Sequence, residues 1–399
     1  MASTICNINL VGAGLNNLHE FLSARTQFTR SHMLWPLSNS FLGSSNLCHH
    51  VQKCINPMNT KPVRKKQLHW HRQTYCETAG ENSVPSQHKN EENISKATLI
   101  WRAVKLPIYS VALVPLTVGT AASYLQTGVF FARRYFLLLA SSALIIAWLN
   151  LSNDVYDFDT GADKNKKESV VNMVGSRTGT LVAAYVLLAL GIVGLALAST
   201  EAGNIQSILL LLSAIGCGYI YQCPPFRLSY HGLGEPLCFA AFGPFATAAF
   251  YLIQGNISDV HGGLPFTSTV LSASIFVGIT TTLILFCSHF HQVEGDQAVG
   301  KFSPLVRIGT RRGSQVVKVT VVALYALLFI FGWSKTIPLT CTFLCALTMP
   351  TGHLVVHYVE ENYNDKAKIF MAKYYCVRLH ALFGAALAIG LVAARRIWC

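Results

Sequence analysis

Asn and Asp side chains are concentrated in residues 149–163 (LNLSNDVYDFDTGAD). Asn153, Asp154 and Asp157 are three and four residues apart, so they share one face if the segment is helical. Asp163 follows beyond the expected helix end. Clustered carboxylates repel one another unless a cation lies between them, and Mg²⁺ commonly takes one or two carboxylates plus substrate phosphates. The segment therefore predicts a metal–diphosphate site, with a solvated helix end as the alternative.

A second polar segment, residues 289–296 (HFHQVEGD), ends another apolar run. Gln292 and Asp296 are four residues apart, and His291 and Glu294 are three apart, so each pair can share a helical face. Ionisable groups at the edge of a membrane span are costly and usually face a polar cavity. Two such acidic clusters at the same membrane depth would be poorly neutralised without a metal ion.

Basic residues follow each acidic segment. Lys164 and Arg177 come after the first, and Lys301 and Arg307 come after the second. Lys and Arg bind phosphate oxygens, and carboxylate-bound metal ions do the same. The combination favours a diphosphate site over two unrelated solvated helix ends.

These segments belong to a chain with the composition of a membrane protein. Of its 399 residues, 52% are hydrophobic and 12% are charged, and the mean hydropathy is +0.40. Soluble domains contain roughly 25% charged residues. Each span must satisfy its own backbone hydrogen bonds in lipid, so the expected fold class is an all-α polytopic membrane bundle. About nine apolar runs, most near the roughly 20 residues that a bilayer requires, predict these helices: 104–125, 135–156, 179–199, 205–222, 235–254, 267–290, 315–334, 337–357 and 377–397.

Charge is distributed unevenly among the predicted loops. The loops after the second, fourth, sixth and eighth runs hold most of the Lys and Arg residues, whereas Arg133, Arg134 and Lys335 are exceptions on the opposite side. By the positive-inside tendency, the charged loops and both acidic segments face the stroma, matrix or cytoplasm. These loops and a basic N-terminus explain the net charge of +13, so membrane lipid rather than nucleic acid is the expected partner.

The first 75 residues differ in composition from the remainder. Glu20 is the only acidic residue before Glu77, while Ser, Thr, Arg and Lys are frequent. This composition is typical of an organelle transit peptide, with a disordered tail as the alternative. The predicted organisation is a transit peptide at 1–75, a polar linker at 76–100 and a membrane domain at 101–399.

Three stretches resemble a known family: 153–157 (NDVYD), 230–235 (YHGLGE) and 289–294 (HFHQVE), the last continuing to Lys301 and Arg307. NDxxD ending the second span, with another acidic motif ending the sixth, resembles the UbiA superfamily of membrane prenyltransferases over the whole membrane part. The pattern is most similar to the MenA branch, which prenylates 1,4-dihydroxy-2-naphthoate, in its cyanobacterial and chloroplast form. That form attaches phytyl on the way to phylloquinone.

The resemblance implies a helical bundle that encloses a prenyl tunnel with a polar cap, in a chloroplast membrane and with its active site facing the stroma. It implies Mg²⁺-dependent phytyl transfer from phytyl diphosphate to 1,4-dihydroxy-2-naphthoate, with loss of CO₂. The implied metal ligands are Asn153, Asp154, Asp157, Asp163, Gln292, Glu294 and Asp296. The implied diphosphate-binding residues are Lys164, Arg177, Lys301 and Arg307. The implied acceptor-binding residues are Tyr221, Arg227, Glu235 and His289. The implied catalytic residues are Asp154, Asp157, Asp296 and His291.

The chain departs from the commoner superfamily pattern at two places. Gly161 stands where a third Asp usually follows the Asn, which leaves Asp163 as the substitute. The usual DxxxD of the second motif begins here with Gln292, and Glu294 lies inside it. The ligands of the second motif are therefore less firmly assigned than those of the first.

Other functions remain open from the sequence. Homogentisate, 4-hydroxybenzoate or chlorophyllide are possible acceptors, although HFHQVE argues against them because those branches usually have Asp at the position of Gln292. A secondary transporter usually carries its polar groups near the bilayer midplane, whereas these acids lie at helix ends. A non-catalytic scaffold is the third alternative.

Overall fold

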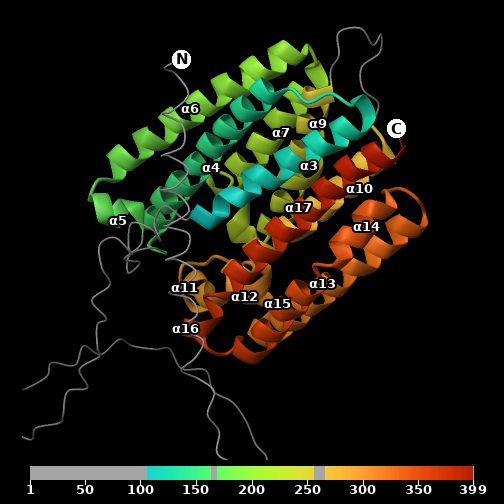
Figure 1. The fold of residues 1–399 in the computed structure, drawn as a ribbon. Coiled ribbons are helices and arrows are strands. Elements are labelled where there is room, and N and C mark those ends of the chain that lie inside the picture. Colours follow the sequence, from blue (N-terminus) through green and yellow to red (C-terminus); the bar gives the residue numbers. More distant parts are fainter. Residues whose placement is uncertain (1–105, 163–168, 256–265, 399) are drawn as a thin grey trace, which may run out of the picture. The chain divides into compact units, whose positions relative to one another are not determined.

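The computed structural model describes residues 106–162, 169–255 and 266–398, and every regular element in these ranges is helical (Figure 1). This confirms the all-α class. The predicted transit peptide and linker, with Asp163 and Lys164, lie outside the described residues. The helices, in chain order, are η1 (Leu106–Tyr109), α3 (Ser110–Thr127), α4 (Ala132–Thr160), α5 (Val170–Val174), α6 (Arg177–Ala202), α7 (Ile205–Gln222), η2 (Leu228–His231), α8 (Gly234–Ala240), η3 (Ala241–Thr247), α9 (Ala248–Gly255), α10 (Ser268–Ser288), η4 (Phe290–Gln292), α11 (Val293–Ala298), α12 (Pro304–Ile308), α13 (Thr310–Trp333), α14 (Leu339–Ala346), α15 (Met349–Asn362), α16 (Lys366–Ile369) and α17 (Ala372–Trp398).

The predicted number of about nine spans is not confirmed. Within the described residues, 7 helices are long and apolar enough to cross a membrane, or 8 if the bent pair α14 and α15 forms one span. The predicted run 104–125 corresponds to α3, which is not among the seven; Thr117, Thr120 and Ser123 interrupt its apolar sequence. The run 337–357 is broken, because α14 and α15 meet at an angle of 43°.

Small residues let the long helices approach one another. Gly194 on α6 faces Ser141 on α4, where a side chain would collide with the serine hydroxyl. Gly243 in η3 faces Gly278 on α10, and an added Cβ would lie 2.7 Å from the carbonyl oxygen of Ser274. Close backbone approach at small residues is a usual way for helices to associate in lipid. These contacts fix α4 and α10, which carry the two acidic motifs.

Short helices form one end of the bundle. Figure 1 shows α5, α11, α12 and α16 near the same ends of the long helices, with α11, α12 and α16 close together. Both polar motifs belong to this end, since α4 ends at Thr160 and α10 ends at Ser288. The fold therefore brings together the two segments that the sequence separates widely.

Candidate active site

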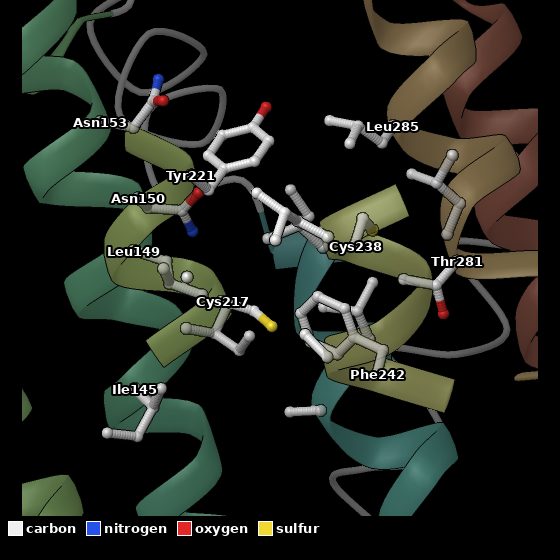
Figure 2. Close-up of a pocket in the computed structure, with 18 of the residues that line it drawn as sticks. Ile145, Leu149, Asn150, Asn153, Cys217, Tyr221, Cys238, Phe242, Thr281 and Leu285 are labelled. Atoms are coloured by element: carbon white, nitrogen blue, oxygen red, sulfur yellow. The ribbon is translucent and has the colours of Figure 1, made fainter. Parts of the chain in front are cut away.

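A cavity of about 330 Å³ lies among α3, α4, α7, η3 and α10. Its lining is apolar over most of its length and polar at the end formed by the short helices. Figure 2 shows Asn150 and Asn153 on α4 together with Tyr221 at one part of the cavity, and Cys217 and Phe242 farther along it. The polar and charged residues that line it include Asn150, Asn153, Asp157, Tyr221, Gln222, His289, Gln292, Lys301, Lys373 and Tyr374.

One face of α4 runs along the whole cavity. Its lining residues extend from Ser142 through Ile145, Leu149 and Asn153 to Asp157 at intervals of three or four. Ser142 and Asp157 are separated by 15 residues (157 − 142), which is roughly 22 Å at the usual rise of an α-helix. A long apolar chain with a polar head fits this arrangement.

Asp157 is held by two hydrogen bonds at the polar end. The amide of Asn153 donates to its Oδ2 at 2.9 Å, and the hydroxyl of Tyr230 donates to its Oδ1 at 3.0 Å. Burial raises the pKa of the Tyr230 hydroxyl, and the negative charge of Asp157 raises it further. Tyr230 therefore stays protonated at neutral pH and orients the carboxylate.

Asp154 is oriented differently from its neighbours in the motif. Its Oδ2 accepts a hydrogen bond of 3.0 Å from the backbone N–H of Val170, at the start of α5, and the residue is not among those that line the cavity. On an α-helix, Asn153 and Asp157 lie about 40° apart, whereas Asp154 is turned about 100° from Asn153. Its predicted metal-binding and catalytic roles stay predictions.

Asp296 of the second motif is buried beside Lys301; Lys301 lines the cavity, whereas Asp296 is not among the lining residues. Lys301 Nζ lies 3.4 Å from Oδ1 of Asp296, and the Lys301 backbone N–H donates to the Asp296 carbonyl at 2.8 Å. Oδ2 of Asp296 is buried and has no hydrogen-bond partner. Lys301 Nζ also lies 5.7 Å from the Tyr230 ring centroid, and Asp157 and Asp296 are close enough for their charges to interact.

Glu294 is not brought to the cavity. Its side chain is 81% exposed and pairs with Lys366 on α16 at 2.8 Å. It lies two positions before Asp296 on α11, so the two side chains leave opposite sides of the helix. When Asp296 is buried, Glu294 therefore faces outward.

The two predicted diphosphate-binding arginines, Arg177 and Arg307, bond to other parts of the protein and do not line the cavity. Arg177 forms two bonds with Asp159, of 2.9 and 2.7 Å. Arg307 donates to the carbonyl oxygens of Phe302 and His231, at 3.1 and 2.8 Å. Of the three predicted diphosphate-binding residues that the structure describes, Lys301 is the one that lines the cavity.

The predicted acceptor-binding residues also divide into two groups. Tyr221 and His289 line the cavity, and Nδ1 of His289 lies 3.2 Å from Oε1 of the buried Glu235. Arg227 instead lies over the ring of Tyr156, with 5.9 Å from its guanidinium carbon to the ring centroid. Gln292 lines the cavity.

His291, the predicted catalytic histidine, packs edge-on against Phe370 with 4.9 Å between the ring centroids. It is not among the residues that line the cavity, unlike His289. His289 immediately precedes η4 and His291 lies within it, so the two side chains point in different directions.

Sequence reasoning missed three residues at the site. Tyr230 lies within the YHGLGE stretch, but nothing local indicates that it reaches Asp157. Asn150 is one turn before Asn153 on the same face of α4. The spacing of three residues could have predicted that both line the cavity. Lys373 appears in the sequence only as one of several loop cations, yet it lines the cavity.

The oxygen donors at the polar end fit Mg²⁺ if substrate supplies further ligands. Among the described residues, no group of three or more His, Cys, Asp or Glu side chains is arranged to hold a metal ion. Magnesium sites that bind phosphorylated substrates commonly use one or two carboxylates, with phosphate oxygens and water completing the octahedron. Asp157 and the unpartnered Oδ2 of Asp296 meet that requirement.

Comparisons with known proteins agree with this geometry. The sequence profile of the UbiA prenyltransferase family matches residues 112–375. The chain is 64% identical over 338 residues to chloroplastic 2-carboxy-1,4-naphthoquinone phytyltransferase of Arabidopsis thaliana, covering 85% of this chain and 87% of that protein. It is 42% identical over 292 residues to 2-carboxy-1,4-naphthoquinone phytyltransferase of a Synechocystis strain, covering 73% and 92% respectively.

Solved structures have the same fold at low sequence identity. A UbiA homolog from Archaeoglobus fulgidus bound to GPP and Mg²⁺ is 16% identical, with a TM-score of 0.52, and the match covers 73% of this chain and 99% of that one. The apo structure of a UbiA homolog from Aeropyrum pernix K1 is 14% identical, with a TM-score of 0.54, and the match covers 72% and 98%.

Proposed function

Because the chain belongs to the UbiA prenyltransferase family, we propose that it transfers phytyl from phytyl diphosphate to 1,4-dihydroxy-2-naphthoate, with loss of CO₂, in phylloquinone synthesis. This acceptor is the quinol form of the 2-carboxy-1,4-naphthoquinone named for the two relatives. The quinol has the electron-rich ring that an electrophilic substitution needs. The observation that carries the proposal is the apolar cavity that ends at Asp157 and Lys301.

The protein acts in a chloroplast membrane, with its cap of short helices facing the stroma. The chloroplastic relative and the membrane-spanning helices support this location. The Lys- and Arg-rich loops at the cap end support the orientation, because such loops remain on the side from which insertion occurs.

The phytyl chain occupies the apolar part of the cavity, and its diphosphate lies at the polar end. Asp157 and Asp296 would hold Mg²⁺, with the side-chain oxygens of Asn153 and Gln292 as neutral donors. When bound, Mg²⁺ neutralises charge that develops on the leaving diphosphate. Lys301 donates hydrogen bonds to the oxygens of the leaving diphosphate. A buried ammonium group in a site with little water strongly stabilises the negative charge that develops there.

The atoms and charges of the reaction balance without an external oxidant or base. The allylic C–O bond breaks and its electron pair leaves with diphosphate. The ring carbon that bears the carboxylate then forms a bond to the allylic carbon. The C–CO₂ bond breaks next, its electron pair restores the aromatic ring, and CO₂ departs. The net products are a phytylated naphthalenediol, CO₂ and diphosphate.

His289 and Glu235 activate the ring. His289 accepts a hydrogen bond from an acceptor hydroxyl, and Glu235 holds the imidazole by its other nitrogen, 3.2 Å away. A partly transferred proton increases the electron density of the ring while the allylic cation forms. Tyr221, which lines the same part of the cavity, places an aromatic ring beside the cation.

The test is an assay of membranes that contain the full chain, with phytyl diphosphate, Mg²⁺ and each candidate acceptor. We expect Mg²⁺-dependent phytylated naphthalenediol and one CO₂ for each product molecule from 1,4-dihydroxy-2-naphthoate. Asp157→Asn and Asp296→Asn should lower the rate of product formation roughly 100-fold or more at unchanged protein levels. Product from homogentisate alone would overturn the acceptor, and no product from any acceptor would overturn the enzymatic function.

A further inference from the structure

Lys373, in the first turn of α17, is one of two Lys or Arg side chains that line the cavity within the described ranges. It is half-buried, and its Nζ lies 3.8 Å from the ring centroid of Phe370 and 5.3 Å from that of Tyr374. Aromatic faces attract an ammonium group without removing its positive charge. The two rings therefore hold a cation at the wall of the cavity.

The other lysine, Lys301, belongs to a different part of the wall. It pairs with Asp296 and lies over the ring of Tyr230, which bonds to Asp157. These contacts assign Lys301 to the side that holds the metal and the diphosphate. Lys373 comes from α17, which packs against α10, the helix that leads into the second motif.

Contacts at the cap place Lys373 near the groups that serve the acceptor. Phe370, over which Lys373 lies, makes a ring contact with His291. His289, which is two positions before His291 and is assigned to the acceptor, lines the cavity together with Lys373. Lys373 is thus a second lysine at the cavity, separate from the Lys301–Asp296 pair, for a reaction with two anionic substrates.

We propose that Lys373 binds the carboxylate of the acceptor, an inference that rests on the proposed function. A carboxylate that enters a half-buried site loses hydration and needs an opposite charge to offset that loss. Arg227, the arginine among the acceptor-binding residues that the resemblance implies, lies over Tyr156 and does not line the cavity.

The assignment also explains how substrate and product are distinguished. The carboxylate is lost as CO₂, so the phytylated product has no group for the ammonium to bind. Lys373 therefore retains the acceptor until carbon–carbon bond formation and contributes nothing to retention of the product. The apolar product can then leave into the lipid.

The experiment compares inhibitors with and without a carboxylate. Inhibition constants of 1-hydroxy-2-naphthoate and 1-naphthol, competing with the acceptor, are measured in membranes for the wild type, Lys373→Met, Lys373→Arg and the control Lys368→Met. Lys368 is exposed and pairs with Asp365 outside the cavity. The wild type and the control should prefer the carboxylated inhibitor.

In Lys373→Met the inhibition constant of 1-hydroxy-2-naphthoate should rise roughly 10-fold or more, the effect of losing a hydrogen bond to a charged group. In the same variant, the inhibition constant of 1-naphthol and the KM for phytyl diphosphate should change little. Lys373→Arg should recover most of the preference for the carboxylated inhibitor. Equal weakening of both inhibitors, or a rise only in the KM for phytyl diphosphate, would overturn the role of Lys373 while leaving the proposed function intact. A wild type that is inactive with 1,4-dihydroxy-2-naphthoate would overturn both.

Discussion

The hydroxyl of Tyr230 donates a hydrogen bond to Oδ1 of Asp157 over 3.0 Å, although the two residues are 73 positions apart in the chain. The same hydroxyl lies 2.8 Å from the Thr160 hydroxyl. A residue of η2 thereby orients a carboxylate at the end of α4. The bond links the first acidic motif to the YHGLGE stretch, a contact that the sequence did not indicate.

Removing the hydrogen bond between Tyr230 and Asp157 should lower the apparent affinity for Mg²⁺ while the protein still folds. Outer hydrogen bonds to metal-binding carboxylates typically contribute 10–100-fold to metal affinity or activity, so Tyr230→Phe should raise the Mg²⁺ concentration for half-maximal activity roughly tenfold. Tyr185→Phe is the matched control, because its hydroxyl contacts Tyr156 on another face. Unchanged Mg²⁺ dependence in Tyr230→Phe would exclude this positioning role.

The same bond should persist at high pH. The folded pKa of Tyr230 is raised above its unfolded value of 10.0 by burial, so its contribution to stability is complete below pH 10 and is lost only as pH rises through the higher folded pKa. Wild-type Mg²⁺ affinity should therefore not fall through ionisation of Tyr230 between pH 7 and about 9. Absorbance titration of Tyr230, by difference from Tyr230→Phe, measures that pKa directly.

Glu294 and Asp296 should respond differently to removal of charge. Asp296→Asn removes a buried carboxylate beside Lys301 and should lower kcat roughly 100-fold or more. Glu294→Gln removes only an exposed partner of Lys366, and such pairs contribute little, so activity should remain within about twofold. A large loss in Glu294→Gln would indicate that Glu294 is a metal ligand, as the sequence suggested.

The apolar part of the cavity lined by Ala246 and Phe250 should limit the length of the prenyl donor. The extended sixteen-carbon main chain of phytyl measures roughly 19 Å with saturated carbon–carbon bonds of ordinary length, close to the roughly 22 Å of lining along α4. Phe250 and Ala246 line the cavity, and both are buried. Ala246→Phe should therefore reduce use of phytyl diphosphate more than that of geranyl diphosphate.

Phe250→Ala should have the opposite effect and increase use of donors longer than phytyl. Phe329→Ala, at an exposed position of α13, is the control for loss of a phenyl ring. Removing a buried phenyl ring costs roughly 3–5 kcal/mol in a protein core, so rates must be normalised to folded protein. Identical donor preferences in all three variants would show that Ala246 and Phe250 do not limit the length of the prenyl chain.

The N-cap of α16 should support the position of Lys373. Oδ1 of Asp365 accepts hydrogen bonds from the backbone N–H groups of Ala367 and Lys368, at 3.0 and 3.1 Å. Asp365→Ala should loosen the segment that leads into α17 and raise the KM for the acceptor severalfold. Asp365→Asn, which keeps a capping oxygen, should remain near the wild type, and equal effects of the two variants would exclude capping as the cause.

This cap is fully ionised at neutral pH. The backbone hydrogen bond from Lys368 is the main cause that lowers the pKa of Asp365 below 3.8. The charged cap is therefore complete above the unfolded pKa and is lost only as pH falls through the lower folded pKa. Ionisation of Asp365 should therefore cause no change of the acceptor KM with pH between pH 6 and 8.

The amino-acid sequence by itself determined the class of protein and the two motifs. Apolar runs of bilayer length predict helices because backbone groups in lipid have no alternative partners. NDVYD and HFHQVEGD stand at the ends of such runs, and that placement was sufficient to infer a metal–diphosphate site. Apolar runs did not determine the count of spans, since the polar residues of α3 and the bend between α14 and α15 depart from simple apolar runs.

Only the tertiary structure decided which members of each motif are buried at the site and which are turned away from it. Asp157 lines the cavity whereas Asp154 bonds to Val170, and Asp296 is buried whereas Glu294 pairs with Lys366. The physical reason is that residue spacing defines relative directions around a helix, but the packing of neighbouring helices sets its rotation. Contacts such as that of Tyr230 with Asp157 depend on the same packing, because no local pattern encodes which distant segments meet.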